Sequence, residues 1–532
     1  MRPEHKKASS YGVAMPSRMR AAERTHARSQ VSLGWRSLVL GLGAGLDRSG
    51  APLHVQLYEN LRADIQSGAI QRGSRMPSSR TLAKSAGLSR NTVLLAFQEL
   101  LVEGYLETVR GSGTYVAQTQ PAPQSPAQAP SGRRPSKRES MVKDIHETGP
   151  DRYREIPGFI RTLSYPKPFR ADYPAIDEFP LKLWMRLTRR AIDVLAGDPA
   201  RMLGECDAAG YPQLREAIAA FVSTAKGLRC TSRNIVIFAG PQQARDIILR
   251  VLTSPGETVW LSDPSPPRVR MSLSAASVEA KPVAIDSEGF DAHLAEACHP
   301  ECRTAYVFPD KQLPLGTTMS LARRRQLLAV LEAKNGWIIE DDSAEDFIQQ
   351  TNILPALQTL DTSDSVIYLG SLNKILFPSL RFGYAVVPDR LVEAVVGARA
   401  IAGGFAPLIE QVVITDFITE GHLAQHIRRM RKVYDQRRQQ MLYAAARHIG
   451  EFVELDPASQ GTQMIGWLKI PVDEAALEQD AAAIGLQLGF LSRFSALGTL
   501  RQGLLLGYGA FDSSEIELGM EKLGRLLKEH AH

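Results

Sequence analysis

Six short apolar segments, separated by stretches long enough to form helices, constrain the fold of this sequence more than any other feature. They are rich in Val, Ile, Leu and aromatic residues and lie at 235–238, 258–261, 304–308, 337–340, 366–369 and 382–387. Strands that alternate with helices are typical of an α/β domain with a largely parallel sheet. In such sheets ligands bind at the carboxyl ends of the strands, so the residues that follow each segment are the first candidates for a functional site.

Two of these segments lead into residues that can bind charged groups. Gly240, Pro241 and Gln242 form a turn in which the proline suits the first position of a helix, and a helix N-terminus can hold a phosphate. Asp341 lies in an acidic run, 340–342, at the end of another segment. Its carboxylate can hold a protonated ring nitrogen, although a metal site or a solvated cluster would use the same residues.

A third segment leads into Lys374, which has apolar neighbours at Leu372 and Ile375. Desolvation lowers the pKa of a lysine and makes the neutral, nucleophilic amine available for Schiff-base chemistry. The simpler interpretation is a surface lysine whose stem lies over apolar residues. Arg381 follows seven residues later as a candidate phosphate partner. A phosphate cradle, a carboxylate and a lysine at successive strand ends form the set that pyridoxal phosphate requires, which favours the reactive amine.

The sequence from Pro52 to Val116 predicts a smaller unit of a different kind. Leu53, Leu57, Leu61 and Ile65 recur every four residues, as in an amphipathic helix. Two further helices are predicted to meet at a glycine turn, each preceded by a serine that can cap it. The second of them keeps its polar residues in the first turn, with which a recognition helix contacts DNA. Two β-prone runs around a Gly-Ser-Gly turn then predict a hairpin.

Charge and composition indicate how these units are connected. Residues 1–161 carry a net charge of +11 (24 Lys and Arg, 13 Asp and Glu), and the other residues carry −5 of the total of +6. A basic end favours nucleic acid as a partner, although a solubilising tail would also be basic. We therefore expect a basic disordered arm at 1–45, a DNA-binding domain at 46–118, a flexible Pro-rich and basic linker at 119–165, and an α/β domain at 166–532 with a large part at about 179–405 and a small part at about 408–532.

We expect neither a membrane segment nor a metal site. The longest apolar stretch near the N-terminus, Leu38 to Leu46, is interrupted by glycine and is too short to span a bilayer. Cys298 and Cys302 have metal-ligand spacing but no second Cys/His pair, and four cysteines in 532 residues do not make a disulfide framework. The sequence therefore predicts a cytoplasmic protein with reduced cysteines.

The N-terminal unit resembles the winged helix-turn-helix domain of GntR-type transcription regulators. Three motifs carry this resemblance over about residues 52–117, namely Pro77–Arg80, Ser89–Thr92 and Gly111–Thr114. The resemblance implies that Arg80 and Arg90 reach the bases or phosphates of a double-stranded DNA operator. The residues that it implies for positioning the backbone are Ser79, Ser89, Asn91, Thr92 and Gly113.

The C-terminal domain resembles fold-type I aminotransferases, which are pyridoxal phosphate-dependent transferases with an α/β fold. Seven stretches carry this resemblance: 210–217, 240–243, 263–264, 312–316, 339–342, 371–374 and 376–378. With the winged domain in front of it, the chain is similar to the MocR type of GntR regulators over about residues 47–527.

This second resemblance implies a role for each residue at the strand ends. Lys374 would form the Schiff base with pyridoxal 5′-phosphate, and Asp341 would pair with the pyridine nitrogen. Arg268 matches a position at which an arginine in some relatives binds the carboxylate of an effector. Arg493 and Arg501 are candidates for a second carboxylate-binding arginine. The residues implied for the cofactor's phosphate are Gly240, Pro241, Gln242, Ser371 and Arg381.

Four residues depart from the pattern of this family. Ser343 stands where relatives commonly have a tyrosine, and Pro266 stands where an aromatic residue usually covers the cofactor ring. Asn373 replaces the usual serine before the lysine, and Lys311 stands where histidine is frequent. The phosphate anchor, the carboxylate and the amine are retained, whereas two ring contacts are missing.

The sequence thus predicts a homodimeric, DNA-binding transcription regulator. Its aminotransferase-like domain is expected to bind pyridoxal phosphate and to sense an amino compound or the cofactor itself. One alternative is an active aminotransferase that also binds DNA, or one that retains a half-reaction. Another is a regulator whose domain has lost the cofactor and only dimerises. Ser343 and Pro266 weigh against the enzyme, since both remove contacts to the ring.

Overall fold

The computed structural model describes residues 46–47, 51–109, 111–118, 165–342, 354–457 and 461–531. These residues belong to two compact units, one within 1–140 and the other within 141–532. The predicted basic arm, all but one residue of the predicted linker, and Ser343 lie outside the described residues. Within those ranges, no helix is both long enough and apolar enough to cross a membrane.

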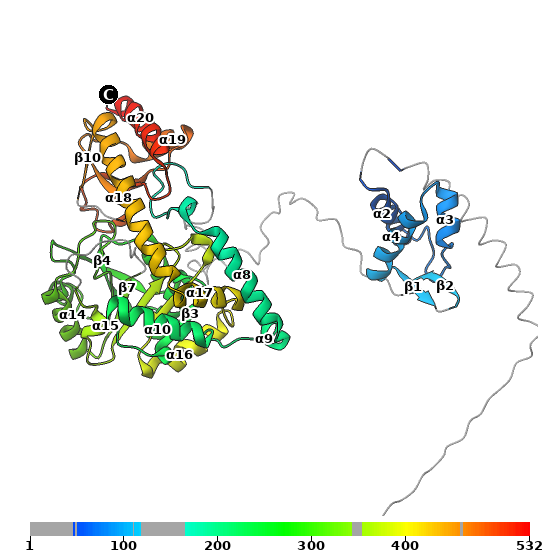
Figure 1. Ribbon diagram of the computed structural model, residues 1–532, viewed down its shortest axis with the longest axis horizontal. Helices are drawn as coiled ribbons and strands as arrows, with labels where there is room; N and C mark the ends of the chain where they lie inside the picture. The colour runs from blue at the N-terminus through cyan, green and yellow to red at the C-terminus, as the bar shows by residue number, and fades with distance from the viewer. Residues whose placement is uncertain are drawn as a thin grey trace, which may run out of the picture. The chain divides into compact units, whose positions relative to one another are not determined.

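The described residues of the N-terminal unit form three helices followed by a two-stranded antiparallel hairpin (Figure 1). Its elements are α2 (Leu53–Gln66), α3 (Ser79–Ala86), α4 (Arg90–Val102), β1 (Leu106–Val109) and β2 (Gly113–Val116). The four-residue repeat of α2 packs against the inner face of α4, and the buried residues include Leu57, Leu61, Ile65, Val93, Phe97 and Leu100. This packing confirms the buried faces that the spacing of apolar residues predicted.

A glycine turn joins α3 to α4, as the sequence predicted. Gly87 ends α3 with a φ of 66°, in the left-handed region that glycine adopts without steric cost. Each helix begins with a serine whose hydroxyl accepts a hydrogen bond from a backbone N–H three residues later. Ser78 accepts from Thr81, and Ser89 accepts from Thr92. These caps fix the first turns of both helices.

The C-terminal unit is built on a seven-stranded sheet with the order β3-β9-β8-β7-β6-β4-β5. Only β9 is antiparallel to its neighbours, which confirms the largely parallel sheet. All six predicted segments form strands. The strands are β3 (Ile235–Phe238), β4 (Thr258–Asp263), β5 (Glu279–Ala284), β6 (Thr304–Val307), β7 (Trp337–Asp342), β8 (Val366–Ser371) and β9 (Gly383–Val386).

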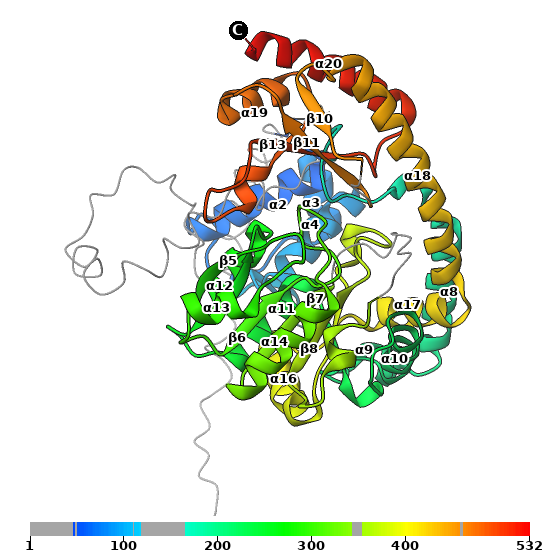
Figure 2. The same ribbon diagram turned by 90° about the vertical axis from the view of Figure 1, so that its left-hand side faces the viewer.

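Helices cover both faces of this sheet (Figures 1 and 2). One face is covered by α11 (Pro241–Leu252), α12 (Pro267–Ala275) and α16 (Asp389–Ile401). On the other face lie α10 (Pro212–Lys226), α13 (Ala292–Cys298), α14 (Leu321–Ala333) and α15 (Leu357–Leu360). Because the inner strands are buried on both faces, they read as continuous apolar runs in the sequence.

The small part contains a four-stranded antiparallel sheet with the order β10-β11-β13-β12. Its elements are β10 (Val453–Leu455), β11 (Gln463–Leu468), α19 (Glu474–Ala483), β12 (Gly489–Phe490), β13 (Gly503–Gly507) and α20 (Ser513–His530). The long helix α18 (His422–His448) runs from the large part to the small part, where it packs along α20 (Figure 2).

Two helices near the start of this unit are α8 (Leu181–Ala196) and α9 (Pro199–Leu203), and α8 packs against both α9 and the later helix α17 (Leu408–Thr419). The sequence predicted that the small part begins at about Leu408. However, α17 packs against α8 and α10, so its contacts join residues 408–419 to the large part.

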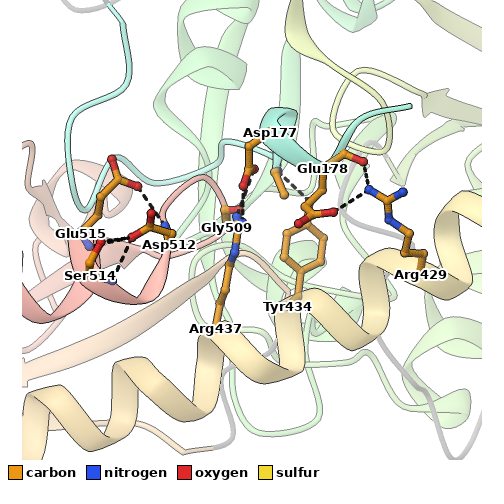
Figure 3. A network of polar contacts seen from close by, with 10 residues as sticks. Asp177, Glu178, Arg429, Tyr434, Arg437, Gly509, Asp512, Ser514 and Glu515 are labelled. Carbon is orange, nitrogen blue, oxygen red and sulfur yellow. Dashed lines mark hydrogen bonds and ion pairs between the residues drawn. The ribbon is translucent and has the colours of Figure 1, made fainter. Parts of the chain in front are cut away.

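The segment that leads into α8 is held against α18 by ion pairs and a hydrogen bond (Figure 3). Asp177 and Glu178 belong to a short helical turn, η1 (Ile176–Glu178). Arg437 of α18 pairs with Asp177 at 2.5 Å, and Arg429 pairs with Glu178 at 2.6 Å. Between them, the hydroxyl of Tyr434 accepts a hydrogen bond from the backbone N–H that precedes η1. These contacts fix the path by which the chain enters the unit.

Candidate functional site

The register of the large sheet brings three predicted strand ends to the same edge. Asp341 lies opposite Leu369 in the parallel pair of β7 and β8. Ser371, the last residue of β8, lies opposite Gly383 of β9, and Gly383 lies opposite Phe238 at the end of β3. The residues predicted to bind the cofactor at 240–242, 341 and 371–374 therefore share one edge of the sheet.

The turn after β3 and the side chain of Arg381 form a cradle. Gly240 has a φ of 95°, which favours glycine, and a Cβ atom there would lie 3.5 Å from Cζ of Arg381. The guanidinium of Arg381 lies 3.4 Å from the carbonyl oxygen of Ala239 and 3.5 Å from Oε1 of Gln242. Since α11 begins at Pro241, its first N–H groups face the same turn. An exposed arginine beside a helix N-terminus is an arrangement that suits a phosphate.

Ser371 and Asn373 hold the loop between β8 and β9 together. The hydroxyl of Ser371 donates to the carbonyl of Phe382 at 2.9 Å and accepts from the backbone N–H of Asn373 at 3.2 Å. The side-chain carbonyl of Asn373 accepts from the backbone N–H of Phe382 at 2.7 Å. The hydroxyl hydrogen of Ser371 is thus used within the loop, and its predicted contact with a phosphate stays a prediction. Asn373, a departure from the family pattern, has a structural role in this loop.

The three acidic residues at the end of β7 point to alternate faces of the sheet, as side chains of a strand do. Glu340 accepts two hydrogen bonds of 2.9 Å from backbone N–H groups at the start of α15. Burial, and then the charge of Asp310, raises the pKa of Glu340 to about 7, although both N–H groups oppose the shift. Asp342 pairs with Lys226 at 2.8 Å. Asp341 faces the opposite side, towards α11.

Asp341 is buried in a polar group that the sequence did not predict. Its Oδ2 atom accepts hydrogen bonds from the hydroxyl of Tyr306 and from Nη2 of Arg245, the latter at 3.2 Å. Nε of Arg245 also donates to the Tyr306 hydroxyl at 2.7 Å. Burial raises the pKa of Tyr306 well above its usual value; Arg245 opposes this shift, and Asp341 adds to it. The phenol therefore stays protonated and acts as a donor to Asp341.

One sequence signal could have revealed Arg245. It lies in α11 among the buried positions Ala244, Ile247, Ile248 and Leu249. A charged residue at a position that the helical period assigns to the core needs a buried partner of opposite charge. Which carboxylate supplies that charge depends on the packing of α11 against the sheet, so the sequence alone does not identify it.

Lys374 forms an ion pair with Asp172, with 2.5 Å between Nζ and Oδ1. Only 21% of the lysine side chain is exposed, so the amine is shielded but accessible. Asp172 has a φ of 63°, in a region that is unfavourable for residues with a Cβ atom. Its segment is fixed nearby, because the carbonyl of the buried Phe169 accepts a hydrogen bond of 2.9 Å from Gly507 of β13. The sequence did not predict this partner for the lysine.

Arg268 lies in the first turn of α12 and completes a group of cations around the site. Although it is accessible to solvent, the surrounding protein lowers its pKa. Asp172 opposes this effect, whereas the charges of Arg245, Arg170 and Arg381 lower the pKa further. Mutual repulsion of this kind indicates an excess of positive charge, which an anionic ligand would offset.

The two other candidate arginines have partners within the small part. Arg493 pairs with Glu478, and Arg501 donates to the carbonyl of Leu468 at 3.0 Å. Pro266, the departure at the ring-stacking position, is the residue that precedes α12. A carboxylate-binding role for either arginine stays a prediction.

In the N-terminal unit, the predicted DNA-binding residues lie at the starts of α3 and α4. Arg80 is in the first turn of α3, while Arg90 and Asn91 begin α4, and all three are exposed. Ser89 caps α4 through Thr92. Ser79 lies beside Ser78, which caps α3 instead. The two helix starts thus present exposed cations from a fixed backbone.

Another cation, which the sequence did not identify, lies beside the hairpin. Gly113, at the start of β2, has a φ of 130°, and a Cβ atom there would lie 3.1 Å from Nε of Arg75. Arg75 also forms a β-bridge with Tyr115. Gly113 therefore makes room for the Arg75 side chain beside the hairpin, in addition to the backbone role predicted for it.

Each of the two units matches a known protein family. Residues 53–116 match the gntR family of bacterial regulatory proteins, and residues 176–479 match aminotransferase class I and II. The chain is 33% identical over 479 residues to the probable rhizopine catabolism regulatory protein MocR of Rhizobium meliloti, a match that covers 90% of this chain and 94% of that protein. It is 25% identical over 466 residues to PdxR, the HTH-type pyridoxine biosynthesis transcriptional regulator of Corynebacterium glutamicum, with 87% and 93% coverage.

Solved structures show the fold of the C-terminal unit. The crystal structure of LysN, the α-aminoadipate aminotransferase of Thermus thermophilus, matches with a TM-score of 0.65 and 25% identity. This match covers 73% of the present chain and 98% of that protein, which was crystallised with N-(5′-phosphopyridoxyl)-L-leucine. The C-terminal unit therefore has the fold of pyridoxal phosphate enzymes, and the N-terminal unit is a DNA-binding domain. The chain belongs to the MocR type of GntR-family transcription regulators, in which a winged helix-turn-helix domain is joined to an aminotransferase-like domain of fold type I.

Proposed function

We propose that this transcription regulator binds pyridoxal 5′-phosphate at the strand ends of its large sheet and responds to an amino compound or to the cofactor itself. The observation that carries the proposal is the meeting of three features at one edge: the cradle of Gly240 and Arg381, the carboxylate of Asp341, and the amine of Lys374. These are the groups that pyridoxal phosphate needs.

The residues around this edge fit an anionic, aldehyde-bearing ligand. The cations Arg268, Arg245 and Arg381 lie close enough to one another for their charges to depress the pKa of Arg268. Nη1 of Arg245 is buried and makes no hydrogen bond within the described residues. When bound, pyridoxal phosphate would supply an aldehyde that reacts with primary amines.

Each residue of the site would have a distinct task. Arg381 and the first N–H groups of α11 would hold the phosphate, with Ser371 donating to it once its hydroxyl turns away from Phe382. Lys374 would bind the aldehyde carbon, whose oxygen would leave as water; for this the amine must leave Asp172 and lose a proton. Neutralisation of the lysine removes half of the ion pair that now holds Asp172.

Regulation would require that ligand binding favours one arrangement of the DNA-binding domains over another. Differential binding of about 1–3 kcal/mol is enough to change operator affinity noticeably.

We propose that the regulator acts as a homodimer. Support comes from α8 and α9, which expose large apolar side chains that a second copy could cover; these are Leu181, Met185, Val194 and Leu203.

A spectroscopic experiment tests cofactor binding. Purified protein mixed with pyridoxal phosphate should develop visible absorbance that borohydride removes, and Lys374→Ala should lack it. Lys281→Ala is a matched control, because Lys281 lies on the edge strand β5 and pairs with Glu279 away from the site. Absorbance that is equal in the wild type and in Lys374→Ala would contradict the proposal.

A second experiment tests regulation. Footprinting on the DNA that flanks the regulator's own gene should show a protected operator, and the protection should change when pyridoxal phosphate or an amino compound is added. Protection that is identical with and without every ligand would contradict the sensing role, while leaving DNA binding intact. Sustained turnover of an amino donor and an oxo acid would instead indicate an active aminotransferase.

A further inference from the structure

Helix α4 carries large apolar side chains on the face that it turns to solvent. Leu94 and Leu95 are 38% and 46% exposed. Among the described helices of the N-terminal unit, the exposed large apolar side chains are those of Leu94, Leu95 and Val102, and all three lie on α4. A single exposed leucine is ordinary, but two adjacent ones on a helix whose first turn lacks acidic residues indicate a contact surface.

Two amide side chains complete this face of α4. Residues three and four positions apart are neighbours on a helix surface, so Leu94 and Leu95 both lie between Asn91 and Gln98. Both amide residues are exposed. The residues of the opposite face pack in the core of the unit; they are Val93, Ala96, Phe97 and Leu100. The exposed face therefore presents two carboxamides and two apolar side chains, with Arg90 at its start.

These groups match the major-groove edge of an A·T base pair. Adenine presents an acceptor and a donor to which one carboxamide can bond twice, and thymine presents a methyl group that packs against apolar side chains. A G·C pair presents two acceptors on guanine, which suit an arginine or a lysine, and an amino group on cytosine. A leucine placed over such a pair would cover polar atoms without satisfying them, which is unfavourable.

DNA is also the partner that the charges near this face favour. Arg90 begins α4, and Arg80 lies in the first turn of α3; both are exposed. Phosphates on either side of a groove offset such cations. A second copy of this domain would bring the same two cations and would not offset them.

We propose that α4 reads A·T base pairs in the major groove, with Leu94 and Leu95 against thymine methyl groups and Gln98 bonded to adenine. The inference goes beyond the proposed function and does not depend on cofactor binding, because it concerns the DNA-binding domain alone. Arginine contacts then supply much of the affinity, whereas these three side chains discriminate between base pairs. The operator should accordingly contain adjacent A·T pairs where α4 enters the groove.

Removal of single methyl groups from the DNA tests this readout. Selection from a pool of random duplexes with the full-length protein supplies the probe, and each thymine of the selected duplex is then replaced in turn by deoxyuridine, which lacks only the methyl group. In fluorescence anisotropy, the wild type should bind about fourfold more weakly for each methyl group that it contacts. Leu94→Ala combined with Leu95→Ala should bind the thymine and deoxyuridine duplexes equally.

The structure offers a matched control for this double variant. Both leucines are exposed and alanine is a good helix former, so the helix should remain folded. Val102→Ala also removes an exposed apolar side chain from α4, but about 12 Å along the helix from Leu94, and should keep the wild-type response to deoxyuridine. Gln98→Ala should lose sensitivity to 7-deazaadenine, which lacks the N7 acceptor, at one position of the duplex.

Four results would overturn the inference. The first is a selected site without adjacent A·T pairs, and the second is a wild type that loses no affinity at any replaced thymine. The third is a double variant that responds to deoxyuridine as the wild type does; if its self-association in analytical ultracentrifugation also changes, the face belongs to a second copy of the chain. The fourth is a selection that enriches no duplex, which would contradict DNA binding itself.

Discussion

Asp172 and Lys374 are held together by an ion pair, although the aspartate belongs to the segment by which the chain enters the C-terminal unit and the lysine lies beyond β8. The aspartate also has a left-handed backbone conformation, which is unfavourable for it by roughly 1–2 kcal/mol. Such strain is typical of positions retained for function. The pair stabilises the ammonium form of the lysine, and a reaction with an aldehyde requires the amine.

Replacing Asp172 should therefore make Lys374 react faster. In Asp172→Asn, the amide keeps the shape of the side chain and its tolerance of a left-handed conformation, but removes the charge. Stopped-flow absorbance after mixing with pyridoxal phosphate should show a rate several-fold above that of the wild type. Asp177→Asn, which breaks a different ion pair of the same segment with Arg437, should react at the wild-type rate. Equal rates in all three proteins would contradict a gating role for Asp172.

The phosphate cradle can be tested with two glycine substitutions. Gly240→Ala and Gly256→Ala both place a side chain on a residue with a φ near 90°, which should cost about 1–3 kcal/mol of stability in each case. Nothing lies within 4 Å of a Cβ atom at Gly256, whereas one at Gly240 meets Arg381 and Gln242. Equilibrium dialysis should thus detect weaker binding of pyridoxal phosphate only for Gly240→Ala. Similar affinities for both variants would place the phosphate elsewhere.

Glu340 should make the stability of the C-terminal unit depend on pH. Its pKa is about 7 in the folded protein and near 4.3 in an unfolded chain, so the folded state binds more protons between these values. Stability should therefore fall as the pH rises from about 4 to 7, by up to about 3–4 kcal/mol from this residue. Glu340→Gln lacks this contribution. Urea unfolding at pH 5 and pH 8 should show a larger loss in the wild type, and parallel losses would contradict the assignment.

Arg90 should contribute to DNA affinity because it is exposed in the first turn of α4. Arg90→Ala should weaken operator binding by about 1–3 kcal/mol if the side chain contacts a base. If it contacts a phosphate, binding should weaken for all sequences and the salt dependence should decrease by about one counterion. Fluorescence anisotropy at several salt concentrations distinguishes these outcomes. Lys84→Ala, in the last turn of α3, is the control, and equal effects of both variants would argue against a specific role for Arg90.

The sequence predicted the inner strands of the large sheet because burial on both faces makes them continuously apolar. The sequence did not predict β5, which lies at the edge of the sheet and contains Lys281 and Pro282. An edge strand is buried less and does not need an apolar run. The boundary at Leu408 was also predicted without knowledge of packing, and the contacts of α17 with α8 and α10 could not be inferred from its own sequence.

At the candidate site, too, some residues were predicted from the sequence and others were not. Gly240, Asp341 and Lys374 follow apolar segments directly, so local patterns were enough to identify them. Asp172 and Arg245 were missed because their significance comes from partners far away in the chain. The neighbouring sequence of neither residue identifies which residue supplies the opposite charge. Long-range charge pairs of this kind depend on how helices and segments pack, which the spacing of apolar residues does not specify.

Helix α18 connects the small part to the segment that precedes α8. Its 27 residues form a helix about 40 Å long. Arg437 and Arg429 of this helix form ion pairs with Asp177 and Glu178, and the helix packs along α20 in the small part. A rod transmits displacement with little bending. A tilt of the small part that moved α18 would therefore either displace Asp177 and Glu178 or break both ion pairs.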